Sequence, residues 1–309
     1  MKLAALLFAA ALLPQAPIER RPPPLPQVPT IKVETRLVNV AVNVVDAHGA
    51  PVAGLTQADF QISEDGRPQK IAFFEKESST PLSIVLAIDA SESVMTNERQ
   101  ERDAARHFVD ALLRDQDELD LMDFADVVRE IVPFTNQKKR IERGLNELQR
   151  GDETALYDAI YLGSQRLATT RMDAGRRRVL VLITDGGDTK GSRYEQALEQ
   201  AQRAGAMVYS LIIVPIAADA GRNTGGEHAL IQMAQDTGGK YYYVEDPKGL
   251  EPAFAHLSDD LRTQYVLGYY APQGAIDQSF RTIKVQMKDP ALRGVYSLRY
   301  RTGYYADTR

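Results

Sequence analysis

Nearly continuous apolar runs, separated by stretches with helical periodicity, most constrain the fold of this 309-residue chain. Three such runs lie at residues 84–88, 178–184 and 206–214. A strand that is apolar on both faces is typical of a parallel sheet covered by helices on both sides. Between the runs, apolar residues recur at helical spacing, for example at Phe108 and Leu112. The pattern predicts an α/β fold with a doubly wound, mostly parallel sheet.

The segments on either side of this α/β stretch alternate with the period of two that is typical of half-buried strands. Valines occupy every second position from 38 to 44, and apolar residues occupy every second position from 283 to 287. We therefore expect a small flanking β-sandwich in which residues 263–309 pack with the N-terminal β module at 32–78. The α/β domain at 79–262 would then be inserted between the two β segments.

The first residues have the pattern of an export signal. A positive start precedes an apolar run at 3–13, and small residues follow near Ala16. This pattern predicts a signal peptide at 1–16, because the run is too short for an ordinary membrane-spanning helix. The alternative is a frayed apolar terminus of a cytosolic protein. Residues 17–31 are rich in proline and predict an extended linker. We expect an exported protein, periplasmic or secreted, with no transmembrane segment beyond the signal.

Composition excludes several classes of function. The formal net charge is -5 and the pI is about 5.5, which disfavours nucleic-acid binding. The absence of cysteine excludes disulfides, thiolate zinc sites and cysteine nucleophiles. The four histidines lack metal-ligand spacing, and the common hydrolase and nucleotide-binding motifs are missing. We expect that the protein is not an enzyme. The arginine run at 176–178 is expected to be a solvated strand entrance.

Polar residues follow two of the apolar runs. Asp89, Ser91 and Ser93 come after the first, and Asp185 comes directly after the second. Between them, the segment GDETALYDAI places Thr154 just before a helical stretch. In a parallel sheet the carboxyl ends of the strands lie at one edge, where ligands bind. We therefore expect two carboxylates and three hydroxyl groups to converge there.

Hard oxygen ligands of this kind suit Mg²⁺ or Mn²⁺. Serine and threonine hydroxyls are neutral, so the ion would keep positive charge that attracts an acidic group of a partner. A second interpretation stays open, since Asp and Ser also cap helices and Asp185-Gly186 is also a turn sequence.

The ordered set of D-x-S-x-S at 89–93, GDETALYDAI and LVLITDGGD resembles the metal-ion-dependent adhesion site (MIDAS) of von Willebrand factor type A (VWA) domains. The resemblance covers roughly residues 80–260. The two flanks resemble the exported VWFA-related proteins of the acidobacterial-domain family.

The resemblance implies a role for each matching position. Ser91 and Ser93 would coordinate the ion directly, and Asp89 and Asp185 would hold it directly or through water. Thr154 would approach or retreat with conformational state. Asp152 and Glu153 depart from the family pattern, because small residues are common at those positions.

These observations predict an exported, adhesion-type protein that binds a protein partner presenting an acidic side chain to the metal. Two alternatives stay open. One is a metal-assisted hydrolase of envelope polymers, in which Glu92, Asp152 or Glu153 would have to serve as the general base. The other is a structural module whose metal site is not functional.

Overall fold

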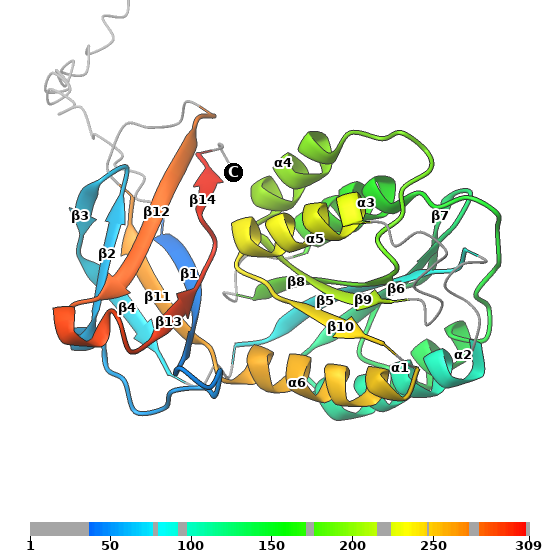
Figure 1. Ribbon diagram of the computed structural model, residues 1–309, viewed down its shortest axis with the longest axis horizontal. Helices are drawn as coiled ribbons and strands as arrows, with labels where there is room; N and C mark the ends of the chain where they lie inside the picture. The colour runs from blue at the N-terminus through cyan, green and yellow to red at the C-terminus, as the bar shows by residue number, and fades with distance from the viewer. Residues whose placement is uncertain are drawn as a thin grey trace, which may run out of the picture. The chain divides into compact units, whose positions relative to one another are not determined.

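The computed structural model describes residues 37–76, 80–91, 98–170, 176–214, 224–245, 247–271 and 278–306. The expected signal peptide at 1–16, the linker at 17–31 and the site residue Ser93 lie outside the described residues. Within the described part of the chain, no helix is long and apolar enough to cross a membrane. These residues form one six-stranded sheet flanked by helices and two four-stranded sheets (Figure 1).

The six-stranded sheet has the order β10-β9-β8-β5-β6-β7. Its strands are β5 (Leu82–Asp89), β6 (Glu118–Phe124), β7 (Val128–Thr135), β8 (Arg177–Thr184), β9 (Ala206–Ile213) and β10 (Tyr241–Val244). All neighbouring strands are parallel except β7, which runs antiparallel to β6 at the edge. The predicted α/β fold with a doubly wound, mostly parallel sheet is thereby confirmed.

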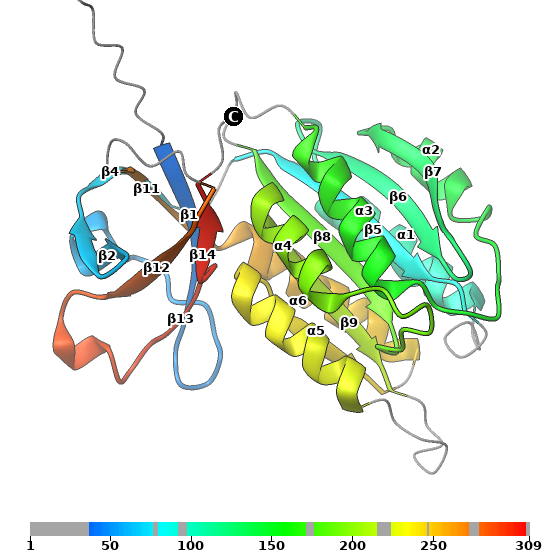
Figure 2. The same ribbon diagram turned by 90° about the horizontal axis from the view of Figure 1, so that it is seen from above.

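Helices cover both faces of this sheet. They are α1 (Glu98–Leu112), α2 (Lys138–Gly144), α3 (Leu156–Ala168), α4 (Tyr194–Ala204), α5 (Thr224–Thr237) and α6 (Leu250–Arg262). Helices α3, α4 and α5 lie on one face, and α1, α2 and α6 lie on the other (Figure 1, Figure 2). Side chains of β5 alternate between the two cores: Leu86 packs on the α1 and α6 side and Val85 on the α3 side. This alternation explains why β5 is apolar along its whole length.

Strand β7 was not predicted from the sequence. Only Val132 of its eight residues is buried, and its apolar residues do not alternate with the period of a strand. Pro133 also lowers strand propensity, because proline cannot donate to the hydrogen-bond ladder. The edge position of β7 tolerates both features.

The arginine run at 176–178 was expected to be solvated, and this expectation is wrong. Arg177 is 7% exposed and Arg178 is 9% exposed. Contacts with the end of α4 and with Gln264 bury them, since Arg178 donates to the carbonyl of Ala204 and Arg177 to the side chain of Gln264.

The two other sheets have the orders β13-β1-β11-β4 and β14-β12-β2-β3 and are antiparallel throughout. Their strands are β1 (Leu37–Val45), β2 (Phe60–Glu64), β3 (Arg67–Gln69), β4 (Ile71–Glu75), β11 (Tyr265–Tyr270), β12 (Phe280–Met287), β13 (Ser297–Arg299) and β14 (Gly303–Tyr305). Three short 3₁₀ turns are η1 (Gln57–Asp59), η4 (Pro247–Gly249) and η5 (Pro290–Leu292). Each sheet pairs strands from both ends of the chain, with β1 next to β11 and β2 next to β12.

The two sheets share one apolar core and one buried carboxylate. Glu64 on β2 accepts hydrogen bonds from the hydroxyls of Tyr269 on β11, at 2.6 Å, and Tyr304 on β14, at 2.8 Å. Burial and the neighbouring Glu64 raise the pKa of Tyr269 well above its usual range.

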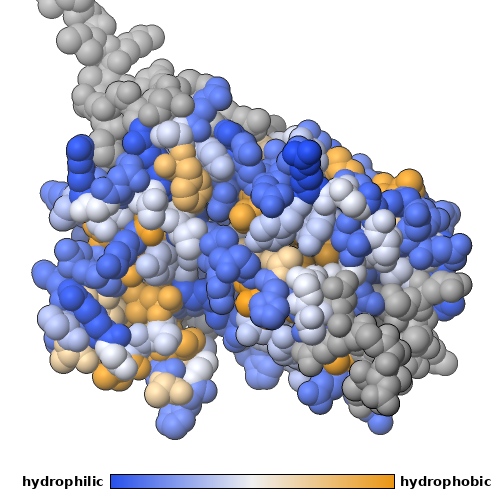
Figure 3. Space-filling view, turned by 45° about the horizontal axis from the view of Figure 1, so that its top comes forward, coloured by the Kyte–Doolittle hydropathy of each residue, from blue (hydrophilic) through white to orange (hydrophobic). Residues whose placement is uncertain are grey.

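The face of the molecule shown in Figure 3 is mostly hydrophilic, with smaller hydrophobic areas between the hydrophilic ones.

We predict that Tyr269→Phe lowers the free energy of unfolding by about 1.5–3 kcal/mol, the range for a hydrogen bond to a charged group. The variant removes the hydroxyl that joins the two sheets and leaves the ring in place. Urea unfolding of this variant checks the prediction against Tyr270→Phe, whose side chain is exposed on the opposite face of the same strand. Equal midpoints for the two variants would contradict it.

Candidate metal centre

The site lies where the strand order of the sheet reverses. The chain runs from β5 to β6 on one side of β5 and reaches β8 on the other side later. Because β5 and β8 are parallel and paired up to Ile88 and Ile183, the residues after both strands share one edge. We call this edge the rim. Ligands of open α/β sheets bind at such a switch point.

Asp89 is the fully buried centre of the rim. Its Oδ1 accepts hydrogen bonds from the backbone N–H of Ser91, at 3.0 Å, and from the Ser91 hydroxyl, at 2.6 Å. Its Oδ2 accepts a hydrogen bond from the hydroxyl of Thr184, at 2.7 Å. The carboxylate is thus fixed in orientation by its own turn and by the last residue of β8.

Burial raises the pKa of Asp89 to about 6, and the negative charge of Asp185 acts in the same direction. The hydrogen bonds from Ser91 and Thr184 only partly oppose this shift. Asp185 therefore lies close enough to disfavour the charged form of Asp89. A cation between them would relieve that repulsion.

A second loop, residues 150–154, lies beside Ser91. Ser91 and Gly151 form a parallel β-bridge, and the Gly151 N–H donates to the Ala90 carbonyl at 3.3 Å. A side chain at Gly151 would place its Cβ 2.8 Å from the Cβ of Ala125, so glycine permits this close approach.

Thr154 links this second loop to the loop after β8. Its backbone N–H donates to the Thr189 hydroxyl at 2.8 Å, and the Thr189 N–H donates to the Thr154 carbonyl at 2.9 Å. Thr154 itself is buried. The structure therefore brings the loops of Asp89, Thr154 and Asp185 together at the rim.

Asp185 is half-buried and its Oδ1 accepts a hydrogen bond from the Gly187 N–H at 3.0 Å. The next residue, Gly186, has a φ of 87°, which favours glycine. A Cβ at Gly186 would lie 3.2 Å from the backbone nitrogen of Glu227 on α5. This glycine lets the first turn of α5 pack closely against the rim loop.

Several residues that support the rim were not predicted from the sequence. Asp126 Oδ1 accepts hydrogen bonds from the backbone N–H groups of Asp152, at 3.1 Å, and Glu153, at 2.9 Å. Asp188 accepts from the N–H of Tyr157, at 3.2 Å, which ties the loop after β8 to the start of α3. The signal for Asp126 was available, since it lies just after the carboxyl end of β6, and Asp89 lies at the carboxyl end of β5.

The two acidic departures from the family pattern differ in their surroundings. Glu153 forms an ion pair with Lys190, so its negative charge is compensated locally. Asp152 is exposed. The second loop therefore adds less net negative charge to the rim than its sequence suggests.

The donor groups at the rim fit a hard divalent cation. Among the described residues, no three His, Cys, Asp or Glu side chains cluster as a metal site. The rim instead offers two carboxylates together with the hydroxyls of Ser91 and Thr154. Such oxygen donors, with water completing the shell, suit Mg²⁺ or Mn²⁺.

We predict that Asp126→Ala loosens the second loop without changing the sheet. The backbone N–H groups of Asp152 and Glu153 lose their shared acceptor, so we expect their hydrogen exchange to become roughly tenfold faster. Asp126→Asn keeps an acceptor oxygen at the same place and is the matched control. Exchange measured by mass spectrometry on peptides spanning 150–155 checks this, and unchanged rates in Asp126→Ala would refute it.

The comparisons with known proteins agree with this architecture. The family model described as von Willebrand factor type A domain matches residues 83–256, more than half of the chain. None of the curated proteins compared matches the sequence. The narrower resemblance of the two flanks to the acidobacterial-domain proteins stays a prediction.

Several solved structures are similar. BatB from Bacteroides thetaiotaomicron is 21% identical, with 58% of this chain and 98% of that chain covered and a TM-score of 0.46. The pilus adhesin SpaC from Lactobacillus rhamnosus GG is 12% identical, with 80% and 47% covered and a TM-score of 0.50. Proximal thread matrix protein 1 from the mussel byssus, with a zinc occupied MIDAS motif, is 14% identical, with 65% and 50% covered and a TM-score of 0.52. The last two likenesses show the shared fold, and the family match shows that this chain belongs to the von Willebrand factor type A domain family.

Proposed function

We propose that this protein is an exported, non-enzymatic binding protein that holds Mg²⁺ or Mn²⁺ at the rim and engages an acidic side chain of a protein partner. VWA domains are commonly protein-interaction modules. The observation that carries the proposal is the pair Asp89 and Asp185. Their charges interact, Asp89 is fully buried, and among the described residues no lysine or arginine side chain pairs with either of them.

Each rim residue has a role in this proposal. Asp89 and Asp185 would supply the negative charge that retains the cation, and Ser91, Ser93 and Thr154 would supply neutral oxygens. The bound cation would supply positive charge and an open position for a carboxylate of the partner. Only two of the five groups are charged, so their negative charge would not exceed the positive charge of the cation. Four carboxylates would make the site net negative and would repel the carboxylate of the partner.

The supporting residues act through position. Thr184 donates to Asp89 Oδ2 and so leaves this carboxylate one orientation. Asp126 and Thr189 hold the loop that carries Thr154. Lys190 compensates Glu153, which reduces repulsion of an approaching acidic side chain.

The non-enzymatic part of the proposal is supported by the missing enzyme motifs and by the state of one of the three possible bases. A hydrolase would need a general base at the rim. Glu153 is engaged by Lys190, which disfavours this role, whereas Asp152 is exposed and Glu92 lies outside the described residues. Export is supported by the signal-like pattern at residues 1–16.

We predict that Mg²⁺ stabilises the wild-type protein against thermal unfolding and that Asp89→Ala and Asp185→Ala abolish this response. A ligand that binds only the folded state, at about 100 times its Kd, adds about 2.7 kcal/mol of stability. Differential scanning calorimetry with Mg²⁺ and with EDTA measures the effect. Asp152→Ala, an exposed acid of the same rim, is the control and should keep the wild-type response. An equal Mg²⁺ response in wild type and in both variants would defeat the metal site.

The partner is tested by affinity capture from envelope extract, with and without chelator, using wild type and Asp89→Ala as bait. Capture that depends on both the metal and Asp89 supports the binding function. Turnover in a screen of phosphoester and ester substrates, lost in Asp89→Ala, would replace it with the hydrolase.

A further inference from the structure

A cavity of about 370 Å³ lies at the opposite end of the sheet from the rim, around the start of β8. Its walls come from β8, from the end of α4 and from strands β1 and β14 of the sandwich. The volume falls within the range of small-molecule sites, about 300–1,000 Å³. None of the proposed metal-binding residues at the rim lines this cavity.

The charge of the cavity wall is strongly one-sided. Five of its residues are arginines, namely Arg176, Arg177, Arg178, Arg203 and Arg301. Among the described residues that line it, none is Asp or Glu. Arg203 pairs with Glu199, which lies outside the wall, so the positive potential of the cavity comes above all from Arg177. The low dielectric of a partly enclosed site strengthens this potential.

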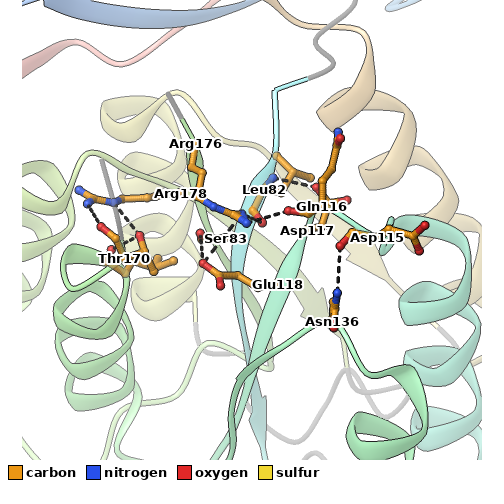
Figure 4. A network of polar contacts seen from close by, with 11 residues as sticks. Leu82, Ser83, Asp115, Gln116, Asp117, Glu118, Asn136, Thr170, Arg176 and Arg178 are labelled. Carbon is orange, nitrogen blue, oxygen red and sulfur yellow. Dashed lines mark hydrogen bonds and ion pairs between the residues drawn. The ribbon is translucent and has the colours of Figure 1, made fainter. Parts of the chain in front are cut away.

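Neutral acceptors hold two of these arginines in place. Arg178 donates from Nη1 to the carbonyl of Ala204, at 2.8 Å, and from Nη2 to the carbonyl of Thr170, at 2.9 Å. Arg176 donates to the carbonyls of Leu82, at 3.0 Å, and Gln116, at 2.7 Å (Figure 4). Arg176 also lies 3.9 Å from Glu118 Oε1, so its charge is partly compensated by an acid outside the wall.

Arg177 is the buried member of the set. Its Nη1 donates to the Gln264 side chain, whereas its Nε and Nη2 have no hydrogen-bond partner. Burial lowers the pKa of Arg177 to about 10, and the charge of Arg262 acts in the same direction. The nearby carboxylate of Asp117 is already paired with Arg262 and accepts a hydrogen bond from the Leu82 N–H. A buried cation with two open donor groups is strongly unfavourable unless an anion accompanies it.

The sandwich side of the cavity is also fixed. Arg301 donates to the carbonyl of Asn39 at 2.7 Å. The adjacent Thr302 N–H donates to the carbonyl of Asp236 at the end of α5, at 3.0 Å. Gly238 has a φ of 78°, and a Cβ there would lie 2.5 Å from the Arg301 nitrogen. Close backbone packing therefore holds Arg301 at the cavity.

The rest of the wall is largely apolar. It includes Leu37, Val38, Ala41, Met207 and Val266. A site with an apolar wall and a few convergent polar groups binds a molecule with an apolar body and one polar head. Guanidinium groups match the oxygens of phosphates and carboxylates, often with two parallel hydrogen bonds.

We propose that this cavity binds a small organic anion, whose phosphate or carboxylate group is held by Arg177 with its neighbouring arginines and whose apolar body contacts the β1 and β11 side chains. The ligand would then contact both the sheet that carries the metal centre and the sandwich.

Isothermal titration calorimetry on the full chain, in an amine buffer without divalent cations, tests the proposal. The probes are phenyl phosphate, benzoate, inorganic phosphate and the neutral benzyl alcohol. We expect one of the two aromatic anions to bind more tightly than inorganic phosphate, because only they fill the apolar wall, and benzyl alcohol not to bind measurably. Comparison of phenyl phosphate with benzoate identifies the preferred head group.

The variants assign the binding to the cavity. Arg177→Met should weaken the better aromatic anion at least about tenfold, the loss expected for a charge-assisted hydrogen bond. Arg67→Met, the same change at an exposed arginine of β3, should leave the affinity unchanged. Asp89→Ala should also bind as wild type, which separates this site from the metal centre.

Arg301→Gln repeats the test if Arg177→Met fails to fold, with an expected loss of about fivefold or more for one guanidinium contact. The proposal is overturned if none of the three anions binds, if benzyl alcohol binds as tightly as the anions, or if the cavity variants keep wild-type affinity.

Discussion

The burial of β5 between two parallel neighbours is the constraint on which the rest of the structure depends. All eight residues of the strand are buried, and the side chains on its two faces pack into two separate cores. Parallel pairing with β8 aligns the ends of both strands, so Asp89 and Asp185 must leave the sheet at one rim. The hydroxyls of Ser91 and Thr184 then partly offset the cost of burying Asp89.

The same sheet separates charge along its strands. β8 begins with buried arginines and ends next to Asp185, so the charges at its two ends are of opposite sign. Among the described residues, neither Arg177 at one end nor Asp89 at the other forms an ion pair. Uncompensated charge of this kind is typical of sites that complete their shell with a ligand. The proposed cation at one edge and the proposed organic anion at the other would each compensate such a charge.

The β-sandwich depends on contacts between the two ends of the chain. Strand β1 pairs with β11 and β13, and the carboxylate of Glu64 on β2 accepts hydroxyl hydrogen bonds from β11 and β14. The described β segments before and after the α/β segment, residues 37–75 and 265–305, therefore share one core. Arg301, which donates to Asn39 across 262 residues, connects this unit to the cavity wall.

The sequence alone determined the fold class and the three loops of the rim, because hydrophobic periodicity reports burial strand by strand and parallel strands must align their ends. It did not reveal β7, an edge strand with one buried residue and an internal proline, or the burial of Arg177. Tertiary structure alone decided that Asp126 holds a loop 26 residues away and that Arg177 meets Gln264 across 87 residues. Such contacts depend on how separate elements pack, and no local pattern of residue types encodes that packing.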